Sequence, residues 1–127
     1  MSNIHDNEIV SYKVDLKNHK IIIHSIQYPS AALTEIVFFE VLAHLFETQL
    51  EGSIIFDVNK YEVGNFFKDN SELLEKQKSY CWPMQYDTIE ELKEKLIEDQ
   101  YAYYVISSSY GLNGWVLAKQ YEIISGK

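Results

Sequence analysis

The chain has 127 residues, of which 46% are apolar and 14% aromatic, and 19 acidic against 11 basic residues give it a formal charge of −8. This length suits a single domain with one core, and the aromatic content argues against a disordered chain. Every basic residue is a lysine. Because nucleic-acid recognition relies on arginine forks and basic patches, a nucleic-acid-binding function is disfavoured.

A single cysteine, Cys81, excludes an intramolecular disulfide and is typical of a reducing cytoplasm. It lies in an apolar run beside Trp82, so we expect a buried, unreactive thiol. No run approaches the ~18 apolar residues that a membrane span requires. We therefore expect a cytoplasmic protein that does not enter the membrane.

Two β-rich segments open the chain. Glu8–Asp15 alternates between apolar and polar residues, as a strand with one buried face does. Lys20–Gln27 is rich in β-branched residues, and a short polar segment joins the two. Together they predict a hairpin that ends at Pro29.

The densest apolar stretch, Thr34–Val58, permits two interpretations. We favour a strand over Glu35–Glu40, an irregular or bulged passage through His44–Glu51, and a strand over Ser53–Val58 that follows Gly52. The alternative is a continuous helix from Thr34 to Leu50, since acidic and apolar residues also recur there at helical spacing.

Two helical regions are predicted between Tyr61 and Asp99, separated by an apolar linker over Tyr80–Met84 that Pro83 keeps out of a helix. Aromatic and leucine residues recur at helical spacing up to Leu74, and Asn70 with Ser71 can interrupt this segment and cap a second short helix. Thr88 and Glu91 form a capping box before the most clearly predicted helix. Its expected buried face comprises Ile89, Leu92, Leu96 and Ile97.

A second hairpin is predicted to close the chain, with strands over Tyr101–Ser107 and Trp115–Ile124 and a turn over Ser108–Gly114. The fold is therefore expected to be α+β. Its mostly antiparallel sheet would have about six strands, from two N-terminal hairpin-like pairs and this C-terminal hairpin, covered by two or three helices.

One acidic window stands out. No basic residue lies between Lys20 and Lys60, and the carboxylates in between give this window an excess of negative charge. Such a window is typical of a solvated face and also suits a basic protein partner. The residues that we predict to contact a partner are Glu40, His44, Glu47 and Glu51.

These side chains do not predict a metal or cofactor site. Glu40, His44 and Glu47 would share one face of a helix, but neither an HExxH motif nor a Cys/His cluster accompanies them. We therefore expect no metal, no cofactor and no catalytic residue.

Four segments carry a resemblance to known proteins: IHDNEIVSYKVDLKNHKIII, FFEVLAHLFETQLEGSIIFDV, YCWP and YYVISSSYGLNGWVLAK. Together they resemble small acidic proteins of Gram-positive bacteria, some of which serve as immunity proteins that protect a cell from its own polymorphic toxin. The resemblance implies a cytoplasmic, non-enzymatic protein that neutralises a basic toxin by stoichiometric binding.

Two other functions remain open at this stage. One is a small-molecule-binding or enzymatic α+β domain that uses His44 or His24 with a neighbouring carboxylate in a pocket. The other is a structural subunit that associates with itself through an edge strand.

Overall fold

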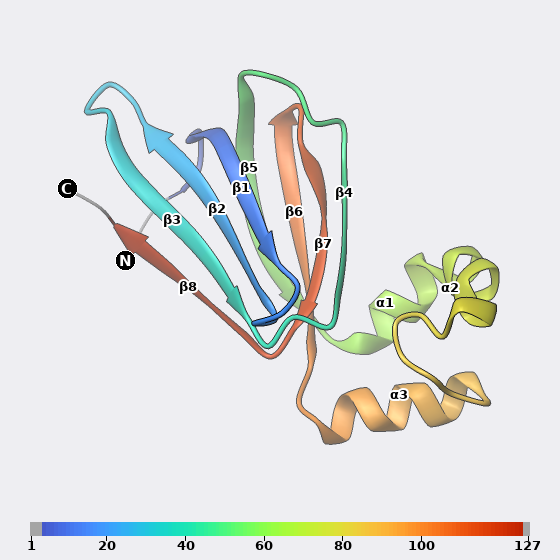
Figure 1. The fold of residues 1–127 in the computed structure, drawn as a ribbon. Helices are drawn as coiled ribbons and strands as arrows, with labels where there is room; N and C mark the ends of the chain where they lie inside the picture. Colours follow the sequence, from blue (N-terminus) through green and yellow to red (C-terminus); the bar gives the residue numbers. More distant parts are fainter. Residues whose placement is uncertain (1–3, 126–127) are drawn as a thin grey trace.

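A computed structural model describes residues 4–125, which form eight strands, three α-helices and one short 3₁₀ helix (Figure 1). The strands are β1 (Glu8–Asp15), β2 (Lys20–Gln27), β3 (Ala32–Phe39), β4 (Ala43–Glu47), β5 (Ser53–Tyr61), β6 (Ala102–Tyr110), β7 (Asn113–Ala118) and β8 (Gln120–Ser125). The helices are α1 (Val63–Asp69), α2 (Ser71–Gln77), the 3₁₀ helix Lys78–Tyr80 and α3 (Ile89–Glu98).

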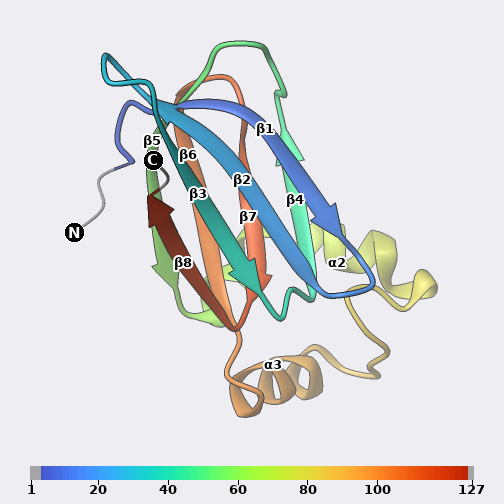
Figure 2. The same ribbon diagram turned by 60° about the vertical axis from the view of Figure 1, so that its left-hand side comes forward.

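All eight strands belong to one antiparallel sheet with the order β4-β7-β6-β5-β1-β2-β3-β8. The sheet folds over on itself between β5 and β1, so that one half lies over the other (Figures 1 and 2). We call β4, β7, β6 and β5 the covered half, because the helices pack on its outer face. We call β1, β2, β3 and β8 the bare half.

Two apolar clusters fill the spaces between these layers. The first lies between the two halves of the sheet and contains Ile21, Ile36 and Phe38 from the bare half with Tyr104 and Val116 from the covered half. The second lies between the covered half and the helices. Its central members are Phe66, Leu74, Leu92, Leu96, Tyr103, Trp115 and Leu117.

The two halves meet again at the start of β8. Only Lys119 separates β7 from β8, yet β7 pairs with β4 and β6 while β8 pairs with β3. The Lys119 N–H donates to the Phe39 carbonyl at 3.2 Å, and the Leu42 N–H donates to the Leu117 carbonyl at 2.8 Å. These bonds hold the end of β3, the start of β4 and the end of β7 together at one corner.

The α+β class and the antiparallel sheet are confirmed, but the sheet has eight strands instead of about six. One extra strand is β4, where we expected an irregular passage. The other arises because the predicted strand Trp115–Ile124 breaks at Lys119. The alternative helix from Thr34 to Leu50 is wrong, since backbone pairing with β2, β8 and β7 keeps this stretch extended.

The capping box of α3 is confirmed in part. The Glu91 N–H donates to Thr88 Oγ1 at 3.1 Å, but the Glu91 carboxylate accepts from the N–H of Asp87, not from that of Thr88. Leu92 and Leu96 are fully buried as expected. Ile97, predicted to line the buried face, is 56% exposed, because it lies at the side of the helix that faces away from α1 and β6.

The prediction of a buried Cys81 is wrong, since its side chain is exposed. Cys81 ends the 3₁₀ helix in the left-handed conformation, with φ of 57°. Trp82, the next residue, packs against the second cluster instead. The apolar linker thus partly buries Trp82 and turns Cys81 toward solvent.

Candidate functional site

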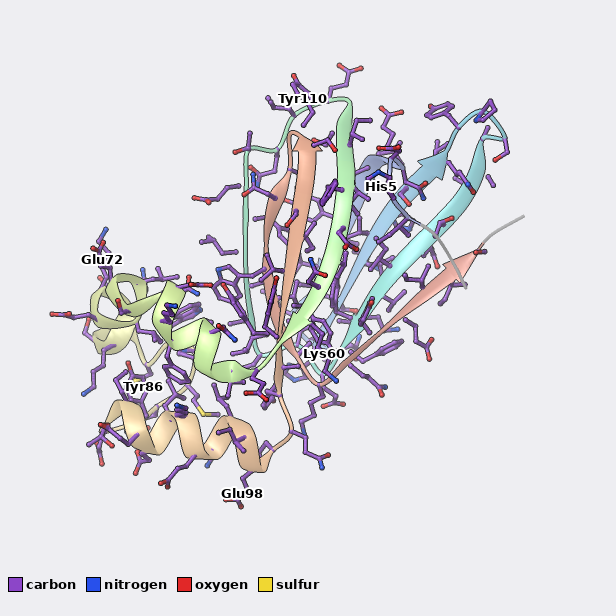
Figure 3. All side chains as sticks on the ribbon, turned by 180° about the vertical axis from the view of Figure 1, so that it is seen from behind. His5, Lys60, Glu72, Tyr86, Glu98 and Tyr110 are labelled. Carbon is purple, nitrogen blue, oxygen red and sulfur yellow. The ribbon has the colours of Figure 1, made fainter. Side chains whose placement is uncertain are left out.

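Charge is distributed unevenly between the two ends of the sheet. We call one end of the sheet the lysine-free end, because its described loops and the strand halves that adjoin them contain no lysine. These loops are 4–7, 28–31, 48–52 and 111–112. Its loops and strand ends carry Asp6, Glu8, Glu47 and Glu51. In Figure 3, Tyr110 marks this end, Lys60 lies toward the opposite end, and Glu98 lies on a helix.

A cleft opens at the lysine-free end between β1 and the loop that joins β4 to β5. It has a volume of about 460 Å³, which is within the range of ligand-binding clefts. It is lined by Glu8, Ile9, Val10, Ser11, Tyr12, Gln49, Leu50, Glu51, Gly52, Ser53 and Leu112. The lining thus combines two carboxylates with apolar and aromatic side chains.

The cleft exists because β1 separates from β5. The two strands pair only through Glu8 with Ile54 and Ile9 with Ser53. The register of β1 against β2 then shifts between Ile9 and Ser11, and such a bulge bends a strand away from its neighbour. Beyond Ile9, no strand in residues 4–125 pairs with the β5-facing edge of β1.

A buried hydroxyl fixes the floor of the cleft. Ser53, 2% exposed, donates from Oγ to the Leu50 carbonyl at 2.6 Å and accepts from the Leu112 N–H at 2.9 Å. Gly111 has φ of +84°, and a Cβ there would overlap the Ser53 side chain. The β6–β7 turn therefore approaches the β4–β5 loop as closely as it does only because residue 111 is glycine.

Tyr12 forms the wall of the cleft nearest the bare half. Its ring meets the Phe46 ring edge-on at 5.0 Å, and its hydroxyl accepts from Gln49 Nε2 at 3.4 Å. Tyr12 is 36% exposed, Val10 47% and Leu50 48%. The contacts with Phe46 and Gln49 hold the Tyr12 side chain, which limits the entropy that it would lose on binding.

The structure separates the four residues that the sequence predicts as partner contacts. Glu51 lines the cleft and Glu47 ends β4 beside it, and both are exposed. Glu40 lies in the β3–β4 connection at the opposite end of the sheet, with φ of 52°. Their helical spacing brings them together only in a helix, and this stretch is a strand.

His44 lies on the inner side of β4, facing the first apolar cluster. It pairs with Val116, and its ring lies 5.2 Å from that of Phe46. Burial lowers the pKa of this imidazole from its ordinary value of 6.5, because desolvation disfavours the charged form. His44 is therefore a half-buried structural residue, separated from Glu51 by the remainder of β4.

Sequence reasoning missed Glu8, Tyr12 and Leu50, which complete the cleft. Glu8 and Leu50 are about 40 residues apart, and only the fold brings them together. The alternation in Glu8–Asp15 predicts which face Tyr12 occupies but not what lies opposite. No local signal identifies this pair of segments.

A second polar group lies on the outer face of the bare half. Ser11 Oγ lies 3.2 Å from His24 Nδ1, and His24 Nε2 lies 3.2 Å from Glu35 Oε2. Nucleophilic catalysis also requires N–H donors aimed at a developing oxyanion. The N–H groups of β2 do not supply such donors, because β2 pairs with β1 on one side and with β3 on the other. The adjacent hollow of about 140 Å³ is smaller than ordinary ligand sites.

In residues 4–125 no three His, Cys, Asp or Glu side chains gather as metal ligands would. None of the helices within that range combines the length and apolar character needed to cross a bilayer. Comparison of the chain with protein-family models, with curated proteins and with solved structures finds no match.

Proposed function

We propose that this chain is a non-enzymatic protein-binding domain that recognises a basic partner through the cleft at its lysine-free end. The observation that carries the proposal is the composition of that cleft. Glu8 and Glu51 border partly exposed Val10, Tyr12 and Leu50, and none of the residues that line the cleft is a lysine.

The two kinds of side chain would have different roles in binding. Carboxylates without neighbouring lysines produce a negative potential that attracts a basic partner and raises the association rate. Tyr12 and Leu50 would then be buried in the complex, and burial of aromatic and apolar anchors mainly slows dissociation. Of the four predicted contacts, the proposal keeps Glu47 and Glu51 and leaves out Glu40 and His44.

We further propose that the partner is a toxin and that the chain acts as its immunity protein in the cytoplasm. The support is the resemblance of the four sequence segments to small acidic proteins of that kind, together with the acidic cleft. Binding at one cleft would give a complex of one chain with one toxin, and inhibition would need no chemical step.

The test compares two variants of equal charge. Glu47→Lys/Glu51→Lys changes the lysine-free end, and Glu94→Lys/Glu98→Lys makes the same change on exposed positions of α3. Each immobilised protein is exposed to lysate of the host, and the proteins retained at low and at moderate salt are identified by mass spectrometry. The retained candidate is then purified and titrated by calorimetry.

We expect a basic protein that the wild type and the α3 variant bind one to one and that the Glu47→Lys/Glu51→Lys variant binds at least tenfold more weakly. If that protein is toxic to cells, co-expression of the wild-type chain should restore growth. Equal retention by all three proteins, or retention lost only in the α3 variant, would rule out the cleft as the binding site.

A further inference from the structure

The outer face of the bare half is a sheet surface that nothing in residues 4–125 covers. The helices pack on the covered half, and neither apolar cluster includes a residue from this face. Figure 2 shows β2, β3 and β8 in front of β6 and β7, with the helices behind and below them. The face nevertheless carries apolar side chains, among them Leu33, 51% exposed, and Ile124, 43% exposed.

The strand registers arrange this face in rows. One row runs across all four strands as Lys13, Ile22, Val37 and Glu122. The next row is Ser11, His24, Glu35 and Ile124. Ile26 and Leu33 follow above it on β2 and β3.

Two of these rows carry side chains of opposite charge, one row at its two ends and the other at its centre. Lys13 stands at one end of its row and Glu122 at the other, with two apolar residues between them. The neighbouring row has His24 and Glu35 at its centre, 3.2 Å apart. The face is therefore nearly balanced in charge, unlike the lysine-free end, and a strongly basic partner has no reason to prefer it.

We propose that this face binds a second copy of the chain, related by a two-fold axis that runs along the strands between β2 and β3. This operation keeps each row opposite itself and exchanges its ends. Lys13 of one copy then faces Glu122 of the other, and His24 faces Glu35. Ile22 faces Val37, which is only 4% exposed, and Ile26 faces Leu33. Ser11 faces Ile124, so the charge complementarity of the arrangement comes from the Lys13–Glu122 and His24–Glu35 pairs.

The size of the face limits the area that a dimer could bury. Four strands about 4.8 Å apart and eight residues long at about 3.3 Å per residue give a footprint of about 500 Å² per copy. Two copies would bury about 1,000 Å², at the lower limit for a specific interface. Interfaces of this size are typical of weak, transient association, so the dimer should be sought at concentrations up to about 1 mM.

The dimer leaves the cleft at the lysine-free end free. That cleft lies on the other edge of β1, beside the β4–β5 loop, whereas the stacked face is the outer side of β2 and β3. This inference therefore stands independently of the proposed function.

A charge-exchange experiment tests the two-fold arrangement. Lys13→Glu or Glu122→Lys alone places like charges opposite each other, whereas the double variant restores opposite charges with their signs exchanged. Within one chain the two positions are three strand spacings apart, about 14 Å, so they cannot form a pair there. Rescue by the double variant is therefore intermolecular, and Glu94→Lys is the matched control.

Sedimentation velocity over a concentration series up to about 1 mM gives the dissociation constant of each protein. We expect each single variant to weaken the dimer at least tenfold and the double variant and the Glu94→Lys control to stay within threefold of the wild type. A wild type that stays monomeric, single variants with no effect, or a double variant that is not rescued would each overturn the proposal.

A cross-linking variant covers the case in which a charge variant does not fold. In a Cys81→Ser background, Lys13→Cys and Glu122→Cys together should give covalent dimers with a short bismaleimide cross-linker, because stacked sheets lie about 10 Å apart, beyond the Cα limit of about 7 Å for a direct disulfide. Each single cysteine faces the other position in the dimer and should stay monomeric. Monomer alone from the double-cysteine variant would contradict the arrangement.

Discussion

The two halves of the sheet have the same strand geometry but opposite outer faces. In the covered half the outward side chains are large and buried, with Tyr103 4%, Trp115 6% and Leu117 fully inaccessible. In the bare half polar and charged residues such as Ser11, Lys13 and Glu122 alternate with the core positions. Strands whose outward side chains are uniformly large and apolar are covered on both faces, whereas a face on which charged and polar side chains are interspersed with apolar ones is left to solvent or to a partner.

The largest expected contrast is in stability. Phe66 is fully buried on α1 and lies 5.1 Å from the Trp115 ring, so Phe66→Ala should lower the free energy of unfolding by about 3–5 kcal/mol. Leu33→Ala on the bare half should cost less than about 1 kcal/mol at concentrations where the chain is monomeric. Urea unfolding of both variants measures the two values, and similar costs would remove the distinction between the halves.

The hydroxyls of two tyrosines, one in each half, make hydrogen bonds that differ in burial. Tyr103 in the covered half donates from its hydroxyl to Asp69 at 3.2 Å and accepts from Asn70 at 3.3 Å, whereas exposed Tyr28 in the bare half donates to Glu8 at 3.0 Å. Tyr103→Phe should cost about 1 kcal/mol because it leaves partly buried partners unsatisfied. Tyr28→Phe, where water replaces the bond, should change stability by less than about 0.5 kcal/mol in the same unfolding assay.

Burial also raises the pKa of the Tyr103 hydroxyl, mainly through desolvation. In an absorbance titration above pH 10, Tyr103→Phe should remove one tyrosine that ionises late. Removal of an early-ionising tyrosine instead would place Tyr103 at the surface.

His44 lies between the halves, and its replacement should have a smaller effect on the free energy of unfolding, which depends on pH. Because its pKa is lowered in the folded state by burial, the unfolded chain binds a proton more readily. The contribution of neutral His44 to the free energy of unfolding is fully present above pH 6.5, the ordinary pKa of the group. This contribution is lost as the pH falls from there through the lowered pKa of the folded state. The slope of unfolding free energy against pH just below 6.5 should be smaller in His44→Gln, and an unchanged slope would contradict the assignment.

The smallest effect is expected on the bare face. The side chains of His24 and Glu35 are 38% and 42% exposed, and exposed ion pairs contribute about 0–1 kcal/mol. Glu35→Gln should therefore leave the stability of the dilute monomer nearly unchanged. A loss of several kcal/mol, measured by urea unfolding, would show that the pair is shielded from solvent.

Much of the fold could be predicted from local pattern. The hairpin Glu8–Gln27 and the capped helix after Thr88 carry period and cap signals within a few residues. The break at Lys119 could not be predicted, because no Gly, Pro, Asn or Asp marks a turn within Trp115–Ile124 and the pairing of β8 with β3 divides this segment. The strand β4 competes with a helical pattern, and pairing with β7 decides the outcome.

Of the candidate site, the sequence could predict only the negative charge and not the residues that complete the cleft. The acidic window identified Glu47 and Glu51, but it also included Glu40, which the fold carries to the opposite end. Glu8 and Tyr12 enter the site because β1 separates from β5 after Ile9, and this depends on a bulge that the sequence does not mark.

The proposed recognition of a basic protein is tested most directly by carboxylate labelling of the wild-type chain, free and mixed with the basic protein that it retains, with modification at each acidic residue measured by mass spectrometry. The account predicts that binding slows labelling of Glu8, Glu47 and Glu51 severalfold and leaves Glu94 and Glu98 on α3 unchanged. Protection on α3 with no change at Glu8 and Glu51 would contradict it.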